Sequence, residues 1–215
     1  MSLGLKTTSD GGEFLPRIQY DARAGRFFQV DRYQDSGGNW ENELTELQLP
    51  LGLVFDMDNI EVGWIKLDNG VDFQMVKVGE QLPDQPSDKH RQGFRALVYN
   101  KALGIRHWNH SAKCVITELD ELHSQWEAER NRHPGQMPVV RIKHTAPVTA
   151  GNGAQRSTNY APKLEIEQWI DRPDAFDGVV NDNEGVPPPK DEPKRPAPSA
   201  PATRETEPAA AGQEF

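Results

Sequence analysis

Strict alternation of apolar and polar residues marks much of the first half of this chain, and a period of two is typical of β-strands. Between Leu47 and Phe55 every second residue is apolar, which predicts a half-buried strand with Pro50 at an edge or a break. Other alternating stretches, rich in aromatic and β-branched residues, predict four more strands: Phe14–Tyr20, Arg26–Tyr33, Glu61–Leu67 and Val71–Val78. Gly25 separates the first pair and Asn69-Gly70 the second, so each pair is expected to form a β-hairpin.

A helical period replaces this alternation after Ser111. Apolar residues recur three, four or seven positions apart and form one stripe: Ala112, Val115, Ile116, Leu119, Leu122 and Trp126. Acidic residues fill the other faces and His133-Pro134-Gly135 ends the pattern, which predicts a helix over Ala112–Asn131. Three further segments have strand character: Gly93–Asn100, Pro138–Thr145 and Lys163–Ile170. Lys101–Asn109 is expected to be a loop.

This order of elements predicts a mainly β fold with one helix. A helix between the third and fourth principal strands of a small closed sheet is the OB-fold arrangement, so we expect an OB-like antiparallel β-barrel with extra hairpins over residues 13–178. Residues 1–12 are expected to form a flexible arm. Residues 179–215 are rich in Pro, acidic, and free of aromatic residues before Phe215, which predicts a disordered tail.

Composition limits the cellular setting. The single cysteine, Cys114, excludes an intramolecular disulfide and fits a reducing compartment. No run of about 18 apolar residues is present to span a membrane, and the N-terminal residues lack the pattern of a signal peptide. We therefore expect a soluble cytoplasmic protein without a membrane partner.

Charge is unevenly distributed along the chain, whose formal net charge is -9. From Asp35 to Asp88 there are twelve acidic residues and only two lysines. Two windows, Lys89–Lys113 and Arg130–Leu164, contain six Lys or Arg each and no acidic residue. An acidic protein can still present one positive groove, because the local field attracts a charged ligand.

Aromatic residues lie between the cations of these windows, and this combination suits a single strand of nucleic acid. The residues expected to contact phosphates are Arg91, Arg95, Lys101, Arg106, Arg141, Lys143 and Arg156. The residues expected to stack on bases are Phe94, Tyr99, Trp108 and Tyr160. Trp108 is the leading candidate because Arg106, His107 and His110 surround it, whereas the other tryptophans, Trp40, Trp64, Trp126 and Trp169, are expected in the core. The alternative is a basic face whose aromatic residues turn inward.

The layout resembles the single-stranded DNA-binding proteins of tailed bacteriophages, which combine an OB-type barrel with an acidic tail that ends in Phe. The resemblance rests on architecture and charge pattern and covers most of the chain. It implies sequence-nonspecific binding and protection of single-stranded DNA during replication or recombination in the host cell cytoplasm, without catalysis or a cofactor. It also implies that Glu214 and Phe215 recruit replication or recombination proteins.

Two other function classes stay open. Asp56, Asp58 and Glu61 resemble the carboxylate clusters that hold Mg²⁺ in nucleases, although acidic residues are also common in turns. His107, His110 and Cys114 could supply metal ligands, but the second ligand pair of a zinc site is missing, so we assign no metal site. The other open function class is a protein–protein adaptor or virion component that acts through the tail.

Overall fold

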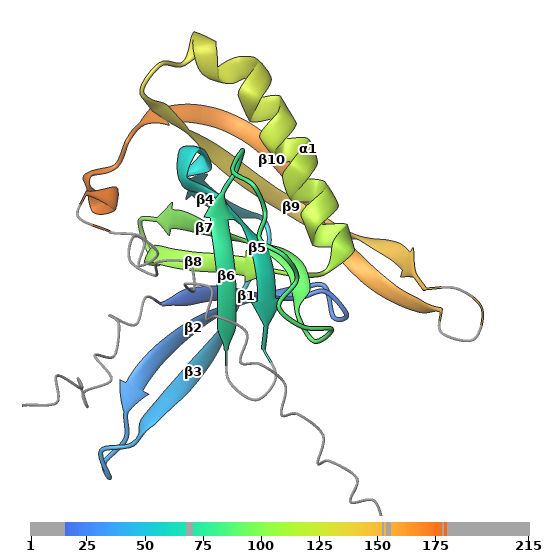
Figure 1. Ribbon diagram of the computed structural model, residues 1–215. Coiled ribbons are helices and arrows are strands. Elements are labelled where there is room, and N and C mark those ends of the chain that lie inside the picture. The colour runs from blue at the N-terminus through green and yellow to red at the C-terminus, as the bar shows by residue number, and fades with distance from the viewer. Residues whose placement is uncertain (1–15, 68–70, 152, 154–155, 178, 180–215) are drawn as a thin grey trace, which may run out of the picture. The chain divides into compact units, whose positions relative to one another are not determined.

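A computed structural model describes residues 16–67, 71–151, 153, 156–177 and 179. Their main feature is one mixed sheet of ten strands, accompanied by one α-helix (Figure 1). The strands are β1 (Arg17–Asp21), β2 (Arg26–Gln34), β3 (Trp40–Leu47), β4 (Leu51–Phe55), β5 (Glu61–Lys66), β6 (Asp72–Lys77), β7 (Arg91–Asn100), β8 (Gly104–His110), β9 (Gln136–Ala150) and β10 (Ser157–Asp171). The helices with described bounds are α1 (Lys113–Glu129) and the short 3-10 turns η1 (Met57–Asn59), η2 (Arg130–Arg132) and η4 (Asp174–Phe176). The prediction of a mainly β fold with one helix is confirmed.

The strand order along the sheet is β10-β9-β4-β7-β8-β1-β2-β3. The β5–β6 hairpin is attached to β7 through β5. Neighbouring strands are antiparallel except β1 and β8, which run parallel with Arg17 opposite His107 and Ile18 opposite Trp108. A strand from the start of the domain therefore lies beside one from its middle.

The β5–β6 hairpin packs closely because Gly63 has no side chain. A Cβ atom there would lie 2.0 Å from the backbone oxygen of Gln74 and 2.9 Å from Cα of Met75. Gly25 has a comparable role in the β1–β2 turn, where its φ of +68° favours glycine and its Cα faces Thr145 and Tyr160. The turn between β1 and β2 is thus in contact with β9 and β10.

Trp108 lies at the centre of the main hydrophobic core and is 0% exposed. Its ring centroid is 5.2 Å from that of Phe94, 5.7 Å from Phe55 and 6.2 Å from Phe27. Helix α1 adds one buried stripe to this core: Val115, Leu119, Leu122 and Trp126. The helix confirms the predicted one to within two residues at each end.

A second, smaller cluster of buried residues comprises Val54, Leu97, Met137 and Phe176. Leu97 belongs to β7, as does Ala96 of the main core. Because successive side chains of a strand point to opposite faces, β7 is covered on both sides along this stretch.

Several predicted boundaries are wrong, for related reasons. Lys101–Asn109 is not a loop, because Gly104–His110 forms β8 and pairs with both β7 and β1. The alternating segment Leu47–Phe55 is divided between the end of β3 and β4, with a cis peptide bond at Leu49-Pro50. The last two strands are 15 residues each, longer than predicted, because they continue to pair beyond the core, from Thr145 to Ala150 of β9.

Other predictions fall outside the described residues. They are the arm over residues 1–12, the Asn69-Gly70 turn, and the tail apart from Val179. No helix in the described part of the chain is long and apolar enough to cross a membrane.

The buried position of Trp108 predicts that its replacement destabilises the fold. Trp108→Ala should lower the free energy of unfolding by about 3–5 kcal/mol, because it removes a large buried side chain and leaves a cavity. Urea denaturation followed by far-UV circular dichroism measures this change. Trp40→Ala is the matched control, since Trp40 is 57% exposed and its loss should change stability by about 0.5 kcal/mol or less. Equal effects of the two substitutions would contradict this assignment of the core.

Candidate functional site

A pocket of about 560 Å³ opens beside β1, β7 and β8. The end of the β5–β6 hairpin forms another of its walls. Its lining residues are Arg17, Ile18, Gln19, Tyr20, Ile65, Leu67, Val71, Phe73, Arg95, His107, Asn109, His110 and Ser111. The lining therefore combines cationic and amide side chains with apolar residues.

Strand register explains why the polar residues meet here. Arg95 lies directly opposite Asn109 on β8, and Arg17 lies directly opposite His107. Their immediate neighbours Ile18, Ala96 and Trp108 are buried in the main core. Because side chains alternate along a strand, the residues between the core positions point into the pocket.

Arg95 is the best-defined polar group of the pocket. Its Nε donates to Oε2 of Glu61 at 2.6 Å, and its guanidinium lies 5.8 Å from the ring centroid of Phe73. Among the described residues, no hydrogen-bond acceptor reaches its buried Nη2. An unpaired buried donor costs free energy, so a shift of this side chain that let an anion or carbonyl oxygen reach Nη2 would be favoured.

His110 also lines the pocket and holds a fixed tautomer. Its Nδ1 accepts from the backbone N–H of Ala112 at 2.8 Å, and its Nε2 donates to the carbonyl of Tyr20 at 3.1 Å. Burial lowers the pKa of His110, against the weaker opposing effects of Tyr20 and Asp21. Its imidazole is therefore neutral and links β1 to the start of helix α1.

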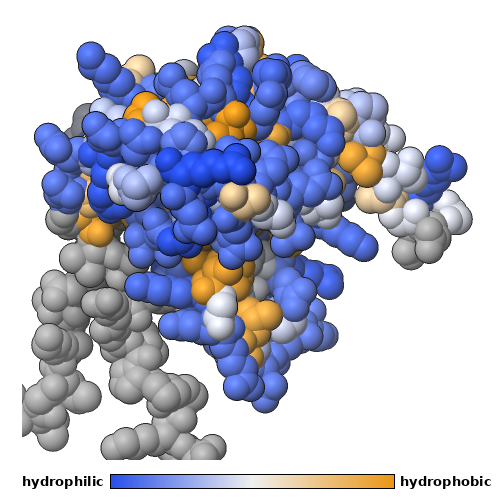
Figure 2. All heavy atoms as spheres, turned by 90° about the horizontal axis from the view of Figure 1, so that it is seen from above, coloured by the Kyte–Doolittle hydropathy of each residue, from blue (hydrophilic) through white to orange (hydrophobic). Residues whose placement is uncertain are grey.

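The rim of the pocket is apolar near the hairpin end. Leu67 is 60% and Val71 is 64% exposed, and Phe73 lies further inside. The surface seen in Figure 2 is mostly hydrophilic and carries its apolar residues in small groups. A pocket with cationic side chains, one aromatic ring and an apolar rim can accept an aromatic ring that is attached to an anionic group.

Three residues predicted to contact nucleic acid are instead buried. Phe94 and Trp108 pack in the main core, so the prediction that they present exposed rings is wrong. The reason is the alternation of β7 and β8, which sends both rings inward. Arg106 shares that side of β8 and is also buried.

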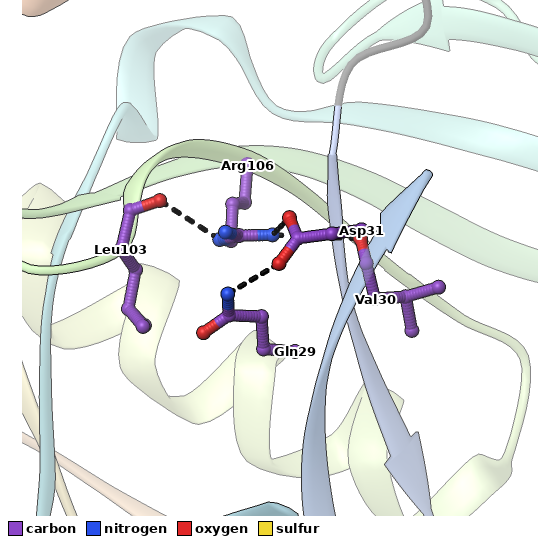
Figure 3. A network of polar contacts seen from close by, with 5 residues as sticks. All are labelled: Gln29, Val30, Asp31, Leu103 and Arg106. Carbon is purple, nitrogen blue, oxygen red and sulfur yellow. Dashed lines mark hydrogen bonds and ion pairs between the residues drawn. The ribbon is translucent and has the colours of Figure 1, made fainter. Parts of the chain in front are cut away.

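Arg106 belongs to a polar network that joins the β7–β8 turn to β2 (Figure 3). Its Nε donates to the carbonyl of Leu103 at 3.0 Å, and its Nη1 lies 2.7 Å from Oδ1 of Asp31. Burial disfavours the charged form of Asp31, yet hydrogen bonds from Arg106 and Gln29 hold the pKa of its carboxyl below the usual value. The guanidinium of Arg106 is thus committed within the protein.

Four of the six cations of the second basic window, including Arg130 beside Asp58, are paired with acidic residues. Arg141 and Lys143 of β9 pair with Glu167 and Glu165 of β10, and Lys163 pairs with Glu118 of α1. The separation of charge along the sequence is therefore largely cancelled in space. Arg141 and Lys143 do not line the pocket.

The remaining predicted residues are scattered. Arg91, Lys101 and Arg156 are exposed, and Arg91 lies on the same face of β7 as Arg95. Tyr99 packs edge-on against Phe176, and Tyr160 is half-buried beside the β1–β2 turn. Glu214 and Phe215 lie outside the described residues. The pocket thus brings together one predicted residue, Arg95, with residues not proposed for nucleic-acid contact, such as Gln19, Phe73 and Asn109.

The carboxylates suggested for Mg²⁺ each face a different cation. Asp56 lies 3.4 Å from Arg172, Asp58 lies 2.9 Å from Arg130, and Glu61 is bound to Arg95. No group of three or more His, Cys, Asp or Glu in the described part of the chain could hold a metal ion. Asp56, Asp58 and Glu61 therefore do not form the metal centre that the nuclease hypothesis requires.

His107, His110 and Cys114 likewise have other surroundings than a metal site would need. Both ring nitrogens of His110 are engaged with backbone groups. Burial raises the pKa of Cys114, whose thiol points to the carbonyl of Tyr160 at 3.7 Å. A protonated thiol is neither a good metal ligand nor a good nucleophile.

A Ser–His–Asp arrangement occurs outside the pocket. Oγ of Ser87 lies 2.8 Å from Nδ1 of His90, whose Nε2 lies 3.0 Å from Oδ2 of Asp72. The backbone N–H of His90 also donates to the carbonyl of Ser87, so these residues close a tight turn. The contacts fasten the segment before β7 to β6, and neither Ser87 nor His90 lines the pocket.

No protein-family model, curated protein or solved structure matches this chain.

The neutral His110 predicts loss of stability in mild acid. Because the pKa of His110 is lowered in the folded state, the unfolded chain takes up this proton first. The contribution of the neutral His110 to the free energy of unfolding is complete above the ordinary histidine pKa of about 6.5. It is lost as pH falls below that value, with a slope of at most about 1.4 kcal/mol per pH unit. Urea unfolding from pH 7.5 to 5 measures the slope.

His110→Gln should flatten this dependence, since glutamine does not titrate. His144→Gln serves as the control because His144 is exposed. An unchanged slope in the His110 variant would show that other groups cause the acid sensitivity.

Proposed function

We propose that this protein binds single-stranded DNA without sequence preference, on the face of β7, β8 and β1 that contains the pocket. The observation that carries the proposal is the set of groups that converge there: Arg17, Arg95, Asn109 and Phe73. Guanidinium groups suit phosphates, and an aromatic ring suits any base because every base has a flat face. Contacts to phosphates and stacking on base faces do not depend on base identity, which favours binding without sequence preference.

Strand order supports an OB-like barrel as the scaffold. The order β10-β9-β4-β7-β8, with α1 between β8 and β9, corresponds to OB strands five, four, one, two and three. In this reading β1 is an added strand that bridges β8 and β10. The backbone N–H of Tyr160 on β10 donates to the carbonyl of Ala22 at 2.7 Å, and the hydroxyl of Tyr20 donates to the carbonyl of Tyr160 at 2.7 Å.

The pocket then lies where OB-folds bind oligonucleotides. Such barrels use the face of their second and third strands together with the loop between the first and second. Here those strands are β7 and β8, and the connection from β4 to β7 contains the β5–β6 hairpin. The groove would continue past Arg91, which is exposed on the same face of β7.

The resemblance to phage single-stranded DNA-binding proteins agrees with this function. On that basis the protein would protect single strands during replication or recombination in the cytoplasm of a host cell. Recruitment of replication or recombination proteins through Glu214 and Phe215 belongs to the same proposal.

Binding should be electrostatic with a stacking component. Phe73→Ala should weaken binding of a labelled oligothymidylate by about 1–3 kcal/mol through the loss of one stacking contact. Arg17→Ala should make the logarithmic salt dependence less steep by roughly 0.7, because one phosphate contact is lost. Fluorescence anisotropy over a salt series measures both effects, and duplex DNA should bind more weakly than the single strand.

Arg132→Ala is the matched control, because Arg132 is an exposed cation on η2 and does not line the pocket. Thermal melting should show that all three variants remain folded. Equal affinity for single and duplex DNA at moderate salt, or pocket variants that bind as the native protein does, would refute the proposed interface.

A further inference from the structure

Strands β2 and β3 form a two-stranded ribbon that extends beyond the rest of the sheet (Figure 1). Strand β1 pairs with β2 only from Arg26 to Val30, whereas β2 and β3 continue to pair as far as Gln34 and Trp40. Among the described residues, β3 pairs with no strand other than β2. Its outer edge therefore presents backbone N–H and C=O groups over eight residues, Trp40–Leu47.

Two exposed apolar residues lie on one face of β3. Trp40 is 57% and Leu44 is 52% exposed, and alternation places both on the same face. The guanidinium of Arg32 lies 4.8 Å from the ring centroid of Trp40 and keeps this ring against β2. Exposed apolar residues beside an open strand edge are typical of surfaces that accept another strand.

The opposite face of β3 is acidic. Glu41 and Glu43 lie two residues apart, and Glu43 is directly opposite Asp31 of β2. Like charges in directly opposite positions destabilise a strand pair. Arg106 compensates Asp31, but within the described residues no cation pairs with Glu41 or Glu43.

The negative field of this face is evident at Tyr33. Its hydroxyl donates to Oε2 of Glu41 at 2.8 Å. This hydrogen bond, with the charges of Glu41 and Glu43, raises the pKa of Tyr33. A cation supplied from outside would relieve the repulsion and satisfy both carboxylates.

We propose that the outer edge of β3 is a docking site for an extended basic segment of a partner protein. The segment joins the sheet as an additional strand through backbone hydrogen bonds. Its Lys or Arg residues, at alternate positions, face Glu41 and Glu43, and its apolar residues cover Trp40 and Leu44. This site is separate from the pocket, so it does not depend on DNA binding.

Charge argues for this occupant over two others. Antiparallel pairing of β3 with a second copy would place Glu41 and Glu43 near the same acidic residues of that copy, which protects an edge against self-association. Nucleic acid would bring phosphates against the same carboxylates. Only a basic strand matches both the charge and the alternation of β3.

The test uses the full chain and two short synthetic peptides of equal composition. In one, Lys and Val alternate; in the other, the lysines and valines are in separate blocks. Both peptides are attracted equally by the net charge of -9, so a difference between them reports the strand pattern. Amide hydrogen exchange and NMR shift perturbation give the binding position and the affinity.

The alternating peptide should protect those β3 amides that do not donate to β2, and should bind roughly ten-fold more tightly than the block peptide. The double substitution Glu41→Lys and Glu43→Lys should abolish this preference and favour a peptide of alternating Glu and Val. Asp84→Lys with Asp120→Lys gives the same change of net charge at exposed positions elsewhere and should leave the preference intact.

Other outcomes would overturn the proposal. Perturbation outside β3, equal binding of the two peptides, or no effect of the charge reversal would exclude strand addition at this edge. If sedimentation reveals a dimer and the charge reversal abolishes it, the occupant is a second copy of the chain. Protection of β3 by oligothymidylate would identify nucleic acid instead.

Discussion

The placement of β8 between two partner strands is the constraint on which both the core and the pocket depend. Strand β8 pairs with β7 on one side and with β1 on the other. Both of its faces are thereby fixed: Trp108 is directed into the core, and His107 and Asn109 into the pocket. A slip of one residue in this register would exchange the two sets and expose Trp108.

In the folded protein, ion pairs cancel much of the charge separation that is seen along the sequence. The acid-free window that contains β9 is compensated by glutamates of β10 and α1. Surface pairs of this kind contribute little to stability individually. Their main effect is on the field, because they leave the pocket with Arg17 and Arg95 as its distinct positive groups, the latter shared with Glu61.

The sequence was sufficient to predict the mainly β fold, helix α1 and, at least in part, eight of the ten strands, because the periodicity of most of these elements is set by one packed face. It failed for Trp108 and Trp40, whose roles are reversed: the first is buried and the second exposed. The polar residues around Trp108 concealed an alternating strand, since the face opposite the tryptophan lines a pocket rather than open solvent. The pocket itself depends on long-range register, such as Arg17 beside His107, which no local pattern encodes.

The contact between Tyr20 and Tyr160 also determines when this domain can be completed. The two residues are 140 positions apart, so a ribosome makes β1 long before the segment of β10 that contains Tyr160. At ordinary rates of synthesis this interval is on the order of ten seconds. During that time β1 can already pair with β2, where the ring of Tyr20 contacts Phe27, but the hydroxyl of Tyr20 lacks its final acceptor. Closure of the domain is therefore a late event of biosynthesis, set by translation as much as by the stability of any single strand pair.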